Sequence, residues 1–568
     1  MQQWGRIALL AAMFVTAYLI ILAWQKDYGP NAQVNQTQVA VAPKVSSPAD
    51  IPNAAAPGKV TDIPSTATTA TAPATAPVQP AGNNLIEVTT DVYHLWINPK
   101  GGDVVRAELL QHDLNKNQDN KPFVILENDA NRVYIAQSGL IGTNGPDANA
   151  AGRPNYETES QQYRLTAGQQ SLAVPLVYQA ANGVEIIKTF TFKAGEYPIN
   201  VSHRIINRGN QAWQGQMFGQ IKRDNSLDPS KSNQGIFQLG TYLGGAWGTP
   251  DEQYNKLKFD DFTSERLNQQ AKSGWVGVVQ HYFVTAWIPD AKYNATLESR
   301  KVDNDNVIGF RTPLINVPAG KQMDVSATLY TGPKIQSELK DLAPGLNQTV
   351  DYGWLWPIAQ VLFMGLKFFH GIVGNWGWAI ILLTCAVKLV LFPLSAKSYR
   401  SMAKMRVIAP EMQRLKEEHG EDRMKFSQEM MALYKKEQVN PLSGCLPLLL
   451  QMPIFLALYW VLMESVELRH APWLGWIQDL SAMDPLFVLP LIMGVTMYVQ
   501  QMLNPQPTDP MQAKVFKLMP VVFTVFLLFF PSGLVLYWII NNLLTILQQW
   551  LVNRSIAKEA ANRVKTAS

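Results

Sequence analysis

The hydrophobic residues of this sequence gather into six long runs, one near the N-terminus and five in the last third. The first run, Ile7 to Trp24, lies between Arg6 and Lys26. It is longer than the apolar core of a signal peptide, which is about 7–15 residues. We therefore predict an uncleaved transmembrane anchor across residues 1–28, with a cleaved signal as the less favoured alternative. The later runs, which we predict to be five more transmembrane helices, are 378–395, 446–463, 486–500, 516–530 and 533–552.

Between the first and second runs the pattern changes twice. Residues 29–83 are rich in Ala, Pro, Thr, Val and Gln and almost free of aromatics, which is typical of a flexible linker. Residues 84–335 instead show short alternating runs separated by turn residues. Asn182-Gly183 and the stretch 98–103 each separate two such runs and predict hairpins. This region is therefore expected to be a large antiparallel β-sandwich.

A helix of different character is expected at residues 350–371, just before the second long run. Its apolar residues fall on one helical stripe, and two tryptophans stand near its start. We predict an amphipathic helix that lies at the membrane surface, anchored by Trp354 and Trp356. The stripe consists of Leu355, Ile358, Leu362, Leu366 and Phe369.

Charge between the runs predicts the orientation of the membrane part. The polar segment 396–438 has ten basic and seven acidic residues, net +3, and the tail 554–568 has four and one, also net +3. The loop 464–484 has four acidic residues and one basic residue, net −3. The positive-inside rule then places segment and tail in the cytoplasm, with the β-sandwich on the other side.

The segment 396–438 is predicted to be a helical hairpin, with its break near residues 419–422. It carries six methionines: Met402, Met405, Met412, Met424, Met430 and Met431. They can form the internal seam of a solvated hairpin, which is the simpler interpretation. They can also offer an adaptable apolar surface to varied partners.

Lys388 is the charged residue inside the first of the five C-terminal runs. An ammonium at that depth costs roughly 2.5–3.5 kcal/mol on insertion scales, which marks a candidate functional site. It can snorkel to the near interface, or it can line a wet cavity. The other runs favour the cavity, because their polar residues also lie in the middle or toward the cytoplasmic end. These residues are Thr384, Gln451, Thr496, Gln500, Thr524, Asn541, Thr545 and Gln548.

This arrangement and the composition exclude several classes of function. No polar residues continue to the outer side, which disfavours a channel or a small-solute transporter. The runs carry no Asp, Glu or His for a proton relay, and the chain has no phosphate-binding loop. The net charge of +4 is too small for a nucleic-acid binder, and the two cysteines both lie in the C-terminal half. The histidines of the sandwich show no metal-ligand spacing, so no metal or cofactor is expected.

Several motifs of the C-terminal region closely resemble the YidC/Oxa family of membrane protein insertases. They are Phe-Pro-Leu at 392–394, Ser-Met-Ala-Lys-Met-Arg at 401–406, Gln-Glu-Met-Met-Ala-Leu-Tyr-Lys at 428–435, Asn-Pro-Leu-Ser-Gly-Cys-Leu-Pro at 440–447, Gln-Met-Pro-Ile-Phe-Leu-Ala-Leu-Tyr at 451–459 and Phe-Pro-Ser-Gly-Leu-Val-Leu-Tyr at 530–537. The resemblance covers about residues 350–553. The anchor, linker and sandwich are similar to the Gram-negative form of the family.

The resemblance implies a multi-domain protein of the bacterial inner membrane, with six transmembrane helices and a periplasmic β-supersandwich. It implies an insertase and chaperone, not an enzyme, that takes the polar segment of an incoming protein into a groove open to the cytoplasm. The family's groove arginine falls at Lys388, where the charge is kept but the planar fork is lost. Positions that contact the incoming segment match Met452, Phe455, Met493, Phe526 and Tyr537.

The partners implied by the resemblance are nascent membrane proteins, the Sec translocon with its accessory proteins, the bilayer and, weakly or transiently, the ribosome. The rival class is a glycan-processing enzyme, because β-supersandwiches resemble sugar-epimerising folds. That function would require an acid–base pair converging on one sheet face, and the sequence alone displays none.

Overall fold

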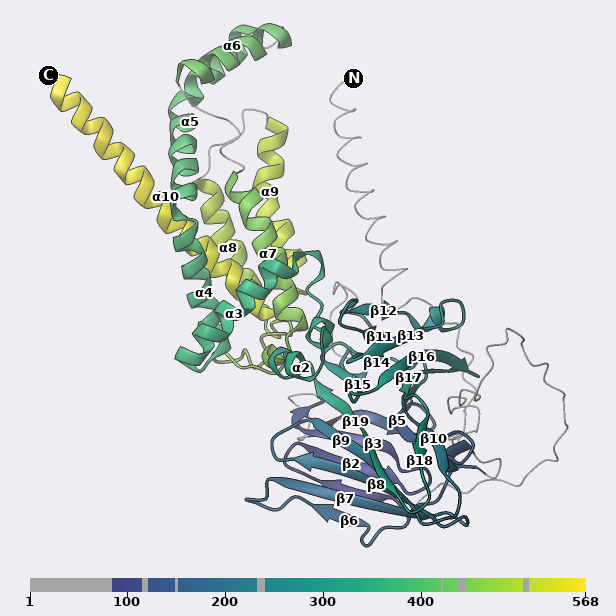
Figure 1. Ribbon diagram of the computed structural model, residues 1–568. Coiled ribbons are helices and arrows are strands. Elements are labelled where there is room, and N and C mark those ends of the chain that lie inside the picture. Colours follow the sequence, from purple (N-terminus) through teal and green to yellow (C-terminus); the bar gives the residue numbers. More distant parts are fainter. Residues whose placement is uncertain are drawn as a thin grey trace. The chain divides into compact units, whose positions relative to one another are not determined.

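The computed structural model describes residues 84–114, 121–148, 152–231, 241–419, 422–437, 446–503 and 510–567. The predicted anchor at 1–28 and linker at 29–83 lie outside these ranges. The chain forms two compact units: a β domain that ends at Val350 and a helical domain that begins at Asp351. Each is described by itself below (Figure 1).

Two sheets make up the β domain, which confirms the predicted sandwich. The larger runs in the order β13 (Asn268–Lys272), β16 (Asn294–Val302), β17 (Asp305–Arg311), β10 (Trp213–Arg223), β5 (Val133–Ile141), β4 (Pro122–Asn128), β3 (Asp103–Asp113), β2 (Tyr93–Asn98), β1 (Ile86–Thr89) and β6 (Gln162–Arg164), with β18 (Ile315–Val317) paired to β10. The smaller runs in the order β12 (Asn255–Leu257), β11 (Gly244–Gly248), β14 (Trp275–Val279), β15 (Phe283–Pro289), β19 (Gln322–Pro333), β9 (Pro198–Asn207), β8 (Val184–Lys193) and β7 (Ser171–Gln179). Among the described strands, β1 and β6 form a parallel pair. The domain ends with the short helix α2 (Gln336–Leu342).

Both predicted hairpins are present. Asn182-Gly183 connects β7 to β8, and Gly183 has the positive φ of 79° that this tight turn requires. The Asn182 side chain accepts a hydrogen bond from the Val184 amide at 3.3 Å, which fixes the turn locally. Residues 98–103 likewise connect β2 to β3. Alternate residues of β2 and β8 are buried, as the alternating sequence predicts.

A fully buried lysine bonds the smaller sheet to the larger. Lys188 on β8 donates to the backbone carbonyls of Gly101, Gly102 and Ser138 at 3.0, 2.8 and 2.8 Å. Burial lowers the pKa of Lys188 to about 7. A Cβ on Gly102 would lie 2.9 Å from the lysine side chain, so glycine is needed there for the lysine to fit.

Arg153 lies beside this lysine and forms ion pairs with two buried carboxylates. Its guanidinium bonds Asp103 and, at 2.8 Å, Asp147. Burial opposes the charge, but the two carboxylates raise the pKa of Arg153 above its ordinary value. His203 pairs with Lys188 in the β8–β9 register, and burial holds its pKa well below the ordinary value. The interior of the sandwich therefore holds a compact set of partnered charges.

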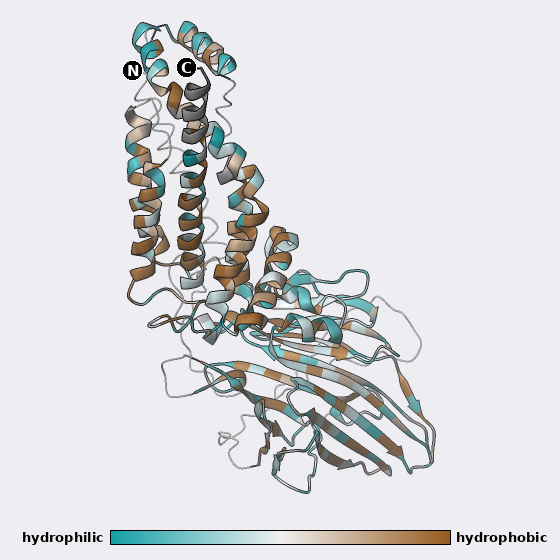
Figure 2. Ribbon diagram, turned by 90° about the vertical axis from the view of Figure 1, so that its left-hand side faces the viewer, coloured by the Kyte–Doolittle hydropathy of each residue, from teal (hydrophilic) through white to brown (hydrophobic). Residues whose placement is uncertain are grey.

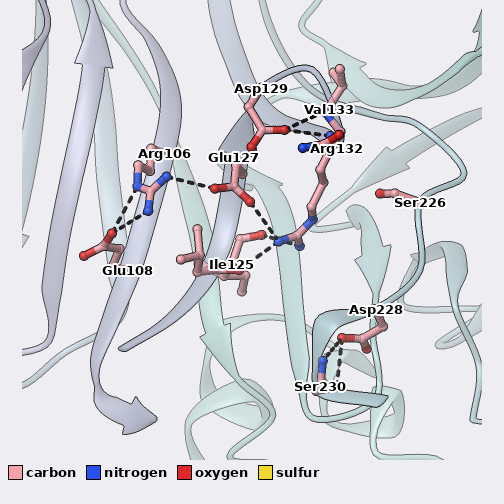
Figure 3. Close-up of polar contacts among 12 residues, drawn as sticks. Arg106, Glu108, Ile125, Glu127, Asp129, Arg132, Val133, Ser226, Asp228 and Ser230 are labelled. Atoms are coloured by element: carbon pink, nitrogen blue, oxygen red, sulfur yellow. Dashed lines mark hydrogen bonds and ion pairs between the residues drawn. The ribbon is translucent and has the colours of Figure 1, made fainter. Parts of the chain in front are cut away.

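A second polar network covers one face of the larger sheet (Figure 3). Arg106 bonds Glu108 and Glu127, each at 2.8 Å. His94 lies 2.5 Å from Glu87 and 3.5 Å from Glu108. The structure thus brings together an imidazole and two carboxylates that the sequence did not display as a converging group. Among the described residues, no cluster of histidine, cysteine or acidic side chains could hold a metal ion.

The helical domain contains α3 (Trp356–Val373), α4 (Trp376–Val390), α5 (Phe392–His419), α6 (Arg423–Lys436), α7 (Leu446–Glu464), α8 (Val488–Met502), α9 (Pro510–Leu527) and α10 (Ser532–Ala567). Figure 2 shows hydrophobic residues concentrated along its long helices, in contrast to the alternation along the strands. Of the described helices, the segments 353–373 and 532–556 are long and apolar enough to cross a membrane. If the bent pair α4–α5 counts as one span, the number of such segments rises to three. Shorter apolar helices cover 449–464 and 488–502, so the six crossings stay a prediction.

The helix expected at the membrane surface corresponds to α3. Leu355, Leu362 and Leu366 of the predicted stripe are buried, whereas Ile358 is exposed. Trp354 and Trp356 are both exposed, as interfacial anchors would be. The length and hydropathy of α3 also suit a membrane span. The interfacial position therefore remains a prediction.

The hairpin predicted at 396–438 is formed by α5 and α6. Met412 packs with Ile408, Leu433 and Tyr434, and Met405 and Met430 flank this cluster. Met424 and Met431 are instead 73% and 59% exposed. The methionines therefore divide between the two interpretations: some form the seam and others face outward.

Lys188 makes the stability of the β domain depend on pH in a direction opposite to that of a salt-bridged lysine. Its pKa is about 7 when folded and near 10.5 when unfolded, so between these values the unfolded chain binds more protons. The free energy of unfolding should therefore rise from pH 7 to pH 10, by up to about 1.4 kcal/mol per pH unit. The Lys188→Met variant should be less stable than the wild type, but its free energy of unfolding should no longer rise over this pH range.

The measurement is urea unfolding of a fragment covering residues 84–350 at several pH values, with tryptophan fluorescence as the signal that reports unfolding. His203→Gln is the control, since its ring is neutral throughout this range. Equal slopes in wild type and Lys188→Met would contradict the assignment.

Candidate functional site

The helix α10 is the centre of the helical domain. It packs against α4, α5, α7 and α8. Its polar residues recur at three- and four-residue spacing inside this apolar surrounding, so they project toward neighbouring helices. They are Asn541, Asn542, Thr545, Gln548 and Gln549.

The predicted groove charge, Lys388, meets α10. Its ammonium donates to the Thr545 hydroxyl at 2.9 Å. That hydroxyl in turn donates to the Asn541 carbonyl at 2.7 Å within its own helix. Lys388 is partly buried, and its Nζ is held between two helices.

Asn541, one turn before Thr545 on α10, carries an acceptor that is not used. Its side-chain oxygen is buried and has no hydrogen-bond partner among the described residues. A buried amide oxygen without a partner costs about 1–3 kcal/mol, unless water or a ligand reaches it. The structure therefore joins Lys388 to Thr545, and Thr545 to the backbone of Asn541, with the Asn541 side-chain oxygen left unpaired. The groove itself stays a prediction.

Thr384 does not join this group through its hydroxyl. It is buried and donates to the Ile380 carbonyl at 2.6 Å, one turn back in α4. Its polar atom is satisfied within the helix, so the presence of Thr384 in an apolar helix does not require a cavity.

A second side-chain contact joins α7 to α10. The Gln451 amide donates to the Tyr537 hydroxyl, and Tyr537 is almost fully buried. Phe455, one turn further along α7, lies edge-on to Trp538 with ring centroids 4.5 Å apart. Met452 is 40% exposed. The resemblance implies that Tyr537 contacts the client, that is, the protein being inserted. The structure shows that Tyr537 also joins two helices.

A third contact joins α8 to α10. Asn542 donates to the Thr496 hydroxyl at 3.2 Å, and that hydroxyl donates to the Met493 carbonyl at 2.8 Å. Gln500 lies one turn further along α8 and is partly buried. Met493 is fully buried. Asn542 was not singled out from the sequence, although it adjoins Asn541 and faces a different neighbour because adjacent helix positions are about 100° apart.

The helix α9 packs on α8 through Thr524. Its hydroxyl donates to the Pro520 carbonyl at 2.7 Å, so it too is satisfied within its helix. The same hydroxyl lies against Gly494 of α8, where an added Cβ would approach to 2.2 Å. Phe526 is 44% exposed and lies beside Phe530.

The opposite end of the bundle is closed by backbone hydrogen bonds from the segment 464–484. Ser532 and Gly533, at the start of α10, donate to the carbonyls of Ala482 and Leu480 at 2.7 and 3.0 Å. Gly377 at the start of α4 meets the Trp473 side chain so closely that a Cβ would approach to 2.1 Å. This segment, here called the end cap, therefore contacts both helices that carry the polar contact at Lys388.

Comparisons with known proteins cover both units. The family model described as YidC periplasmic domain matches residues 85–364, and the model described as 60Kd inner membrane protein matches residues 368–559. A membrane protein insertase YidC of Pseudomonas putida is 51% identical over 563 residues, covering 99% of each chain. That of Azotobacter vinelandii is 50% identical over 556 residues, covering 98% of this chain and 99% of the relative.

The contact between Gly494 and Thr524 gives a test of how α8 and α9 pack. Gly494→Ala should lower the stability of the helical domain by about 1–3 kcal/mol, because the new methyl group overlaps the Thr524 hydroxyl. Adding Thr524→Ala should restore much of the loss by removing that hydroxyl. Thermal unfolding in detergent, with Thr524→Ala alone as control, measures both effects. Additive losses in the double variant would contradict the predicted contact.

Proposed function

This chain belongs to the YidC family of membrane protein insertases, and we propose that it inserts its clients through a polar groove open to the cytoplasm. It is an inner-membrane insertase that acts on membrane proteins in the bilayer. It is not an enzyme, since the relatives that match nearly its whole length are named insertases. The groove, its residues and its orientation are the proposed part.

The observation that carries the groove is the hydrogen bond from Lys388 to Thr545, with an unpaired Asn541 side-chain oxygen one turn away on α10. An intramembrane ammonium that bonds a neighbouring helix, in a region with an unused acceptor, fits a water-filled space better than a snorkelling side chain. Moving a polar segment through about 30 Å of hydrocarbon is prohibitive, and a wet groove that ends midway shortens this path. No covalent step is required.

The residues proposed to line the groove differ in what they offer. Lys388, Asn541 and Thr545 present polar atoms at one place, with Gln451, Thr496 and Gln500 on the neighbouring helices. Thr384 and Thr524 bond their own helices, so they contribute size and shape more than hydrogen bonds.

The proposed client contacts fall into three classes by exposure. Met452 and Phe526 are exposed and can touch an apolar segment directly. Phe455 is partly buried, with its ring against Trp538. Met493 and Tyr537 are buried, so they support the groove wall unless neighbouring helices separate. We expect substitutions of the exposed pair to weaken client crosslinking without unfolding the domain.

Charge asymmetry supports the proposed topology. The hairpin 396–438 and the tail 554–568 are each net +3 and are assigned to the cytoplasm, while the β domain, 84–335, is assigned to the periplasm. The anchor 1–28, the linker 29–83 and the surface helix 350–371 complete this arrangement around a core of residues 372–553. Basic residues and the exposed Met424 and Met431 suit the hairpin for contact with arriving clients or, transiently, the ribosome. The Sec translocon is proposed as a partner on the family resemblance.

The charge at Lys388 provides the main test. Lys388→Arg should remain active, whereas Lys388→Ala and Lys388→Glu should impair insertion. The loss should be greatest, about fivefold, for clients with acidic translocated segments, because a charge pair in a wet groove is worth about 1 kcal/mol. Nearly uncharged clients should be little affected. Protease protection of both client sets, in membranes with equal amounts of each variant, measures this.

Equal insertion of both client sets by Lys388→Glu would remove the electrostatic role of the lysine. A loss of insertion that is equally large for acidic and uncharged clients would instead indicate that Lys388 matters for packing.

The two-unit architecture generates a second test. Deleting residues 84–330 while keeping the first run should leave most insertion activity, because the proposed groove is built within the helical domain. Insertion of the uncharged client set into vesicles is the readout. Complete loss, with the truncated protein still in the membrane, would show that the β domain is required.

A further inference from the structure

The junction between α4 and α5 is sharply bent. The axes of the segments 376–390 and 392–405 differ by 67°. Pro393 lacks the amide hydrogen that would bond the Leu389 carbonyl, which weakens the helix at this point and favours a kink. The Leu391 amide closes the end of α4 by bonding the carbonyls of Val387 and Leu389. The chain itself therefore permits a bend here but does not fix its angle.

Two side chains of α10 contact the two sides of this bend. Before it, Lys388 donates to the Thr545 hydroxyl at 2.9 Å. After it, the Phe392 carbonyl accepts from the Gln548 amide at 3.3 Å. Thr545 and Gln548 are three residues apart and so share one face of α10. Together they bridge the break between α4 and α5.

The hairpin continues directly from this bridge. The helix α5 continues from Phe392 into the hairpin, and Tyr399 is buried on α5 in interaction range of the same Thr545 hydroxyl. Because a helix rises about 1.5 Å per residue, Val407 lies about 22 Å along α5 from the bend. A swing of about 15° at the bend would move Val407 by about 6 Å.

We propose that Thr545 and Gln548 form a latch that holds the α4–α5 bend. We propose further that a client releases this latch when an acidic group of the client binds the Lys388 ammonium. The proposal rests on the proposed function, because its trigger is a client's polar segment in the groove. A carboxylate attracts an ammonium through its full negative charge, whereas a hydroxyl offers only a dipole. An acidic segment would therefore displace Thr545 from Lys388 and remove the contact that holds the α4 side of the bend. Occupancy of the groove would thus be coupled to the position of the cytoplasmic hairpin.

The test is a distance measurement across the latch in the full-length protein. Spin labels are placed at the exposed positions Val407 on α5 and Leu551 on α10, with Cys385 and Cys445 replaced by alanine. Thr545→Val removes the hydroxyl that accepts from Lys388 and keeps the shape of the side chain. Gln548→Leu removes the amide that donates to the Phe392 carbonyl. Each variant in lipid should broaden the distance distribution by several ångströms. Thr545→Ser, which keeps the hydroxyl, should restore the wild-type width.

The trigger is tested with two peptides that share an apolar segment of about 20 residues. One is preceded by three aspartates and the other by three asparagines. The aspartate peptide should broaden the wild-type distribution more than the asparagine peptide, and it should add little to Thr545→Val. Thr384→Val is the matched control, because its hydroxyl bonds its own helix and should leave the width unchanged.

The outcomes separate this proposal from the groove. Unchanged widths in Thr545→Val and Gln548→Leu would overturn the latch, while protease protection of the clients would still test the groove. Broadening in the variants without any response to the aspartate peptide would overturn the trigger. If the aspartate peptide broadens the wild type but equally broadens Thr545→Val, the coupling does not pass through this contact.

Discussion

The helical domain depends on one constraint: polar groups on α10 must find partners inside an apolar bundle. Backbone groups of a helix satisfy one another, whereas the side chains of Asn542, Thr545 and Gln548 all form hydrogen bonds outside α10. Thr545 also donates to a carbonyl of its own helix. Each of the three side chains meets a different element, namely Thr496 of α8, Lys388 of α4 and the Phe392 carbonyl at the start of α5. A further contact from Gln451 of α7 reaches Tyr537. The polar face that is proposed to receive clients is therefore also what determines how the helices are placed.

The β domain solves a related problem in a different way. Its interior charges bond mainly to one another and to the backbone: Arg153 has two carboxylates and Lys188 has three carbonyls. One Asp103 oxygen and both ring nitrogens of His203 are nevertheless buried without a hydrogen-bond partner among the described residues. Unpaired buried atoms therefore occur in both units. The assignment of insertion to the helices rests on their apolar sequence and on the family match, and not on a difference in unpaired atoms.

Local sequence patterns predicted much of this structure. They did not predict contacts between residues that are far apart in the sequence. Asn182-Gly183 specifies a hairpin because glycine supplies the positive φ, and the methionine-bearing segment shows its helical period directly. The depth of Lys388 also follows from counting residues along a helix. Its partner does not, since Thr545 is 157 residues away and packing between helices decides the pair. The same holds for Gln451 with Tyr537, and for the bend at Pro393, whose angle depends on α10.

In the proposed topology, the end cap formed by the segment 464–484 has an electrical consequence. Water entering the proposed groove from the cytoplasm carries the cytoplasmic potential up to the level of Lys388. The hydrogen bonds of Ser532 and Gly533 to this segment close the other end. The voltage, about 2.3 kcal/mol per elementary charge for each 100 mV, then falls across the thin apolar layer beneath the cap. A charged client residue would perform nearly all of its electrical work within that layer, in a field steeper than that of the surrounding bilayer.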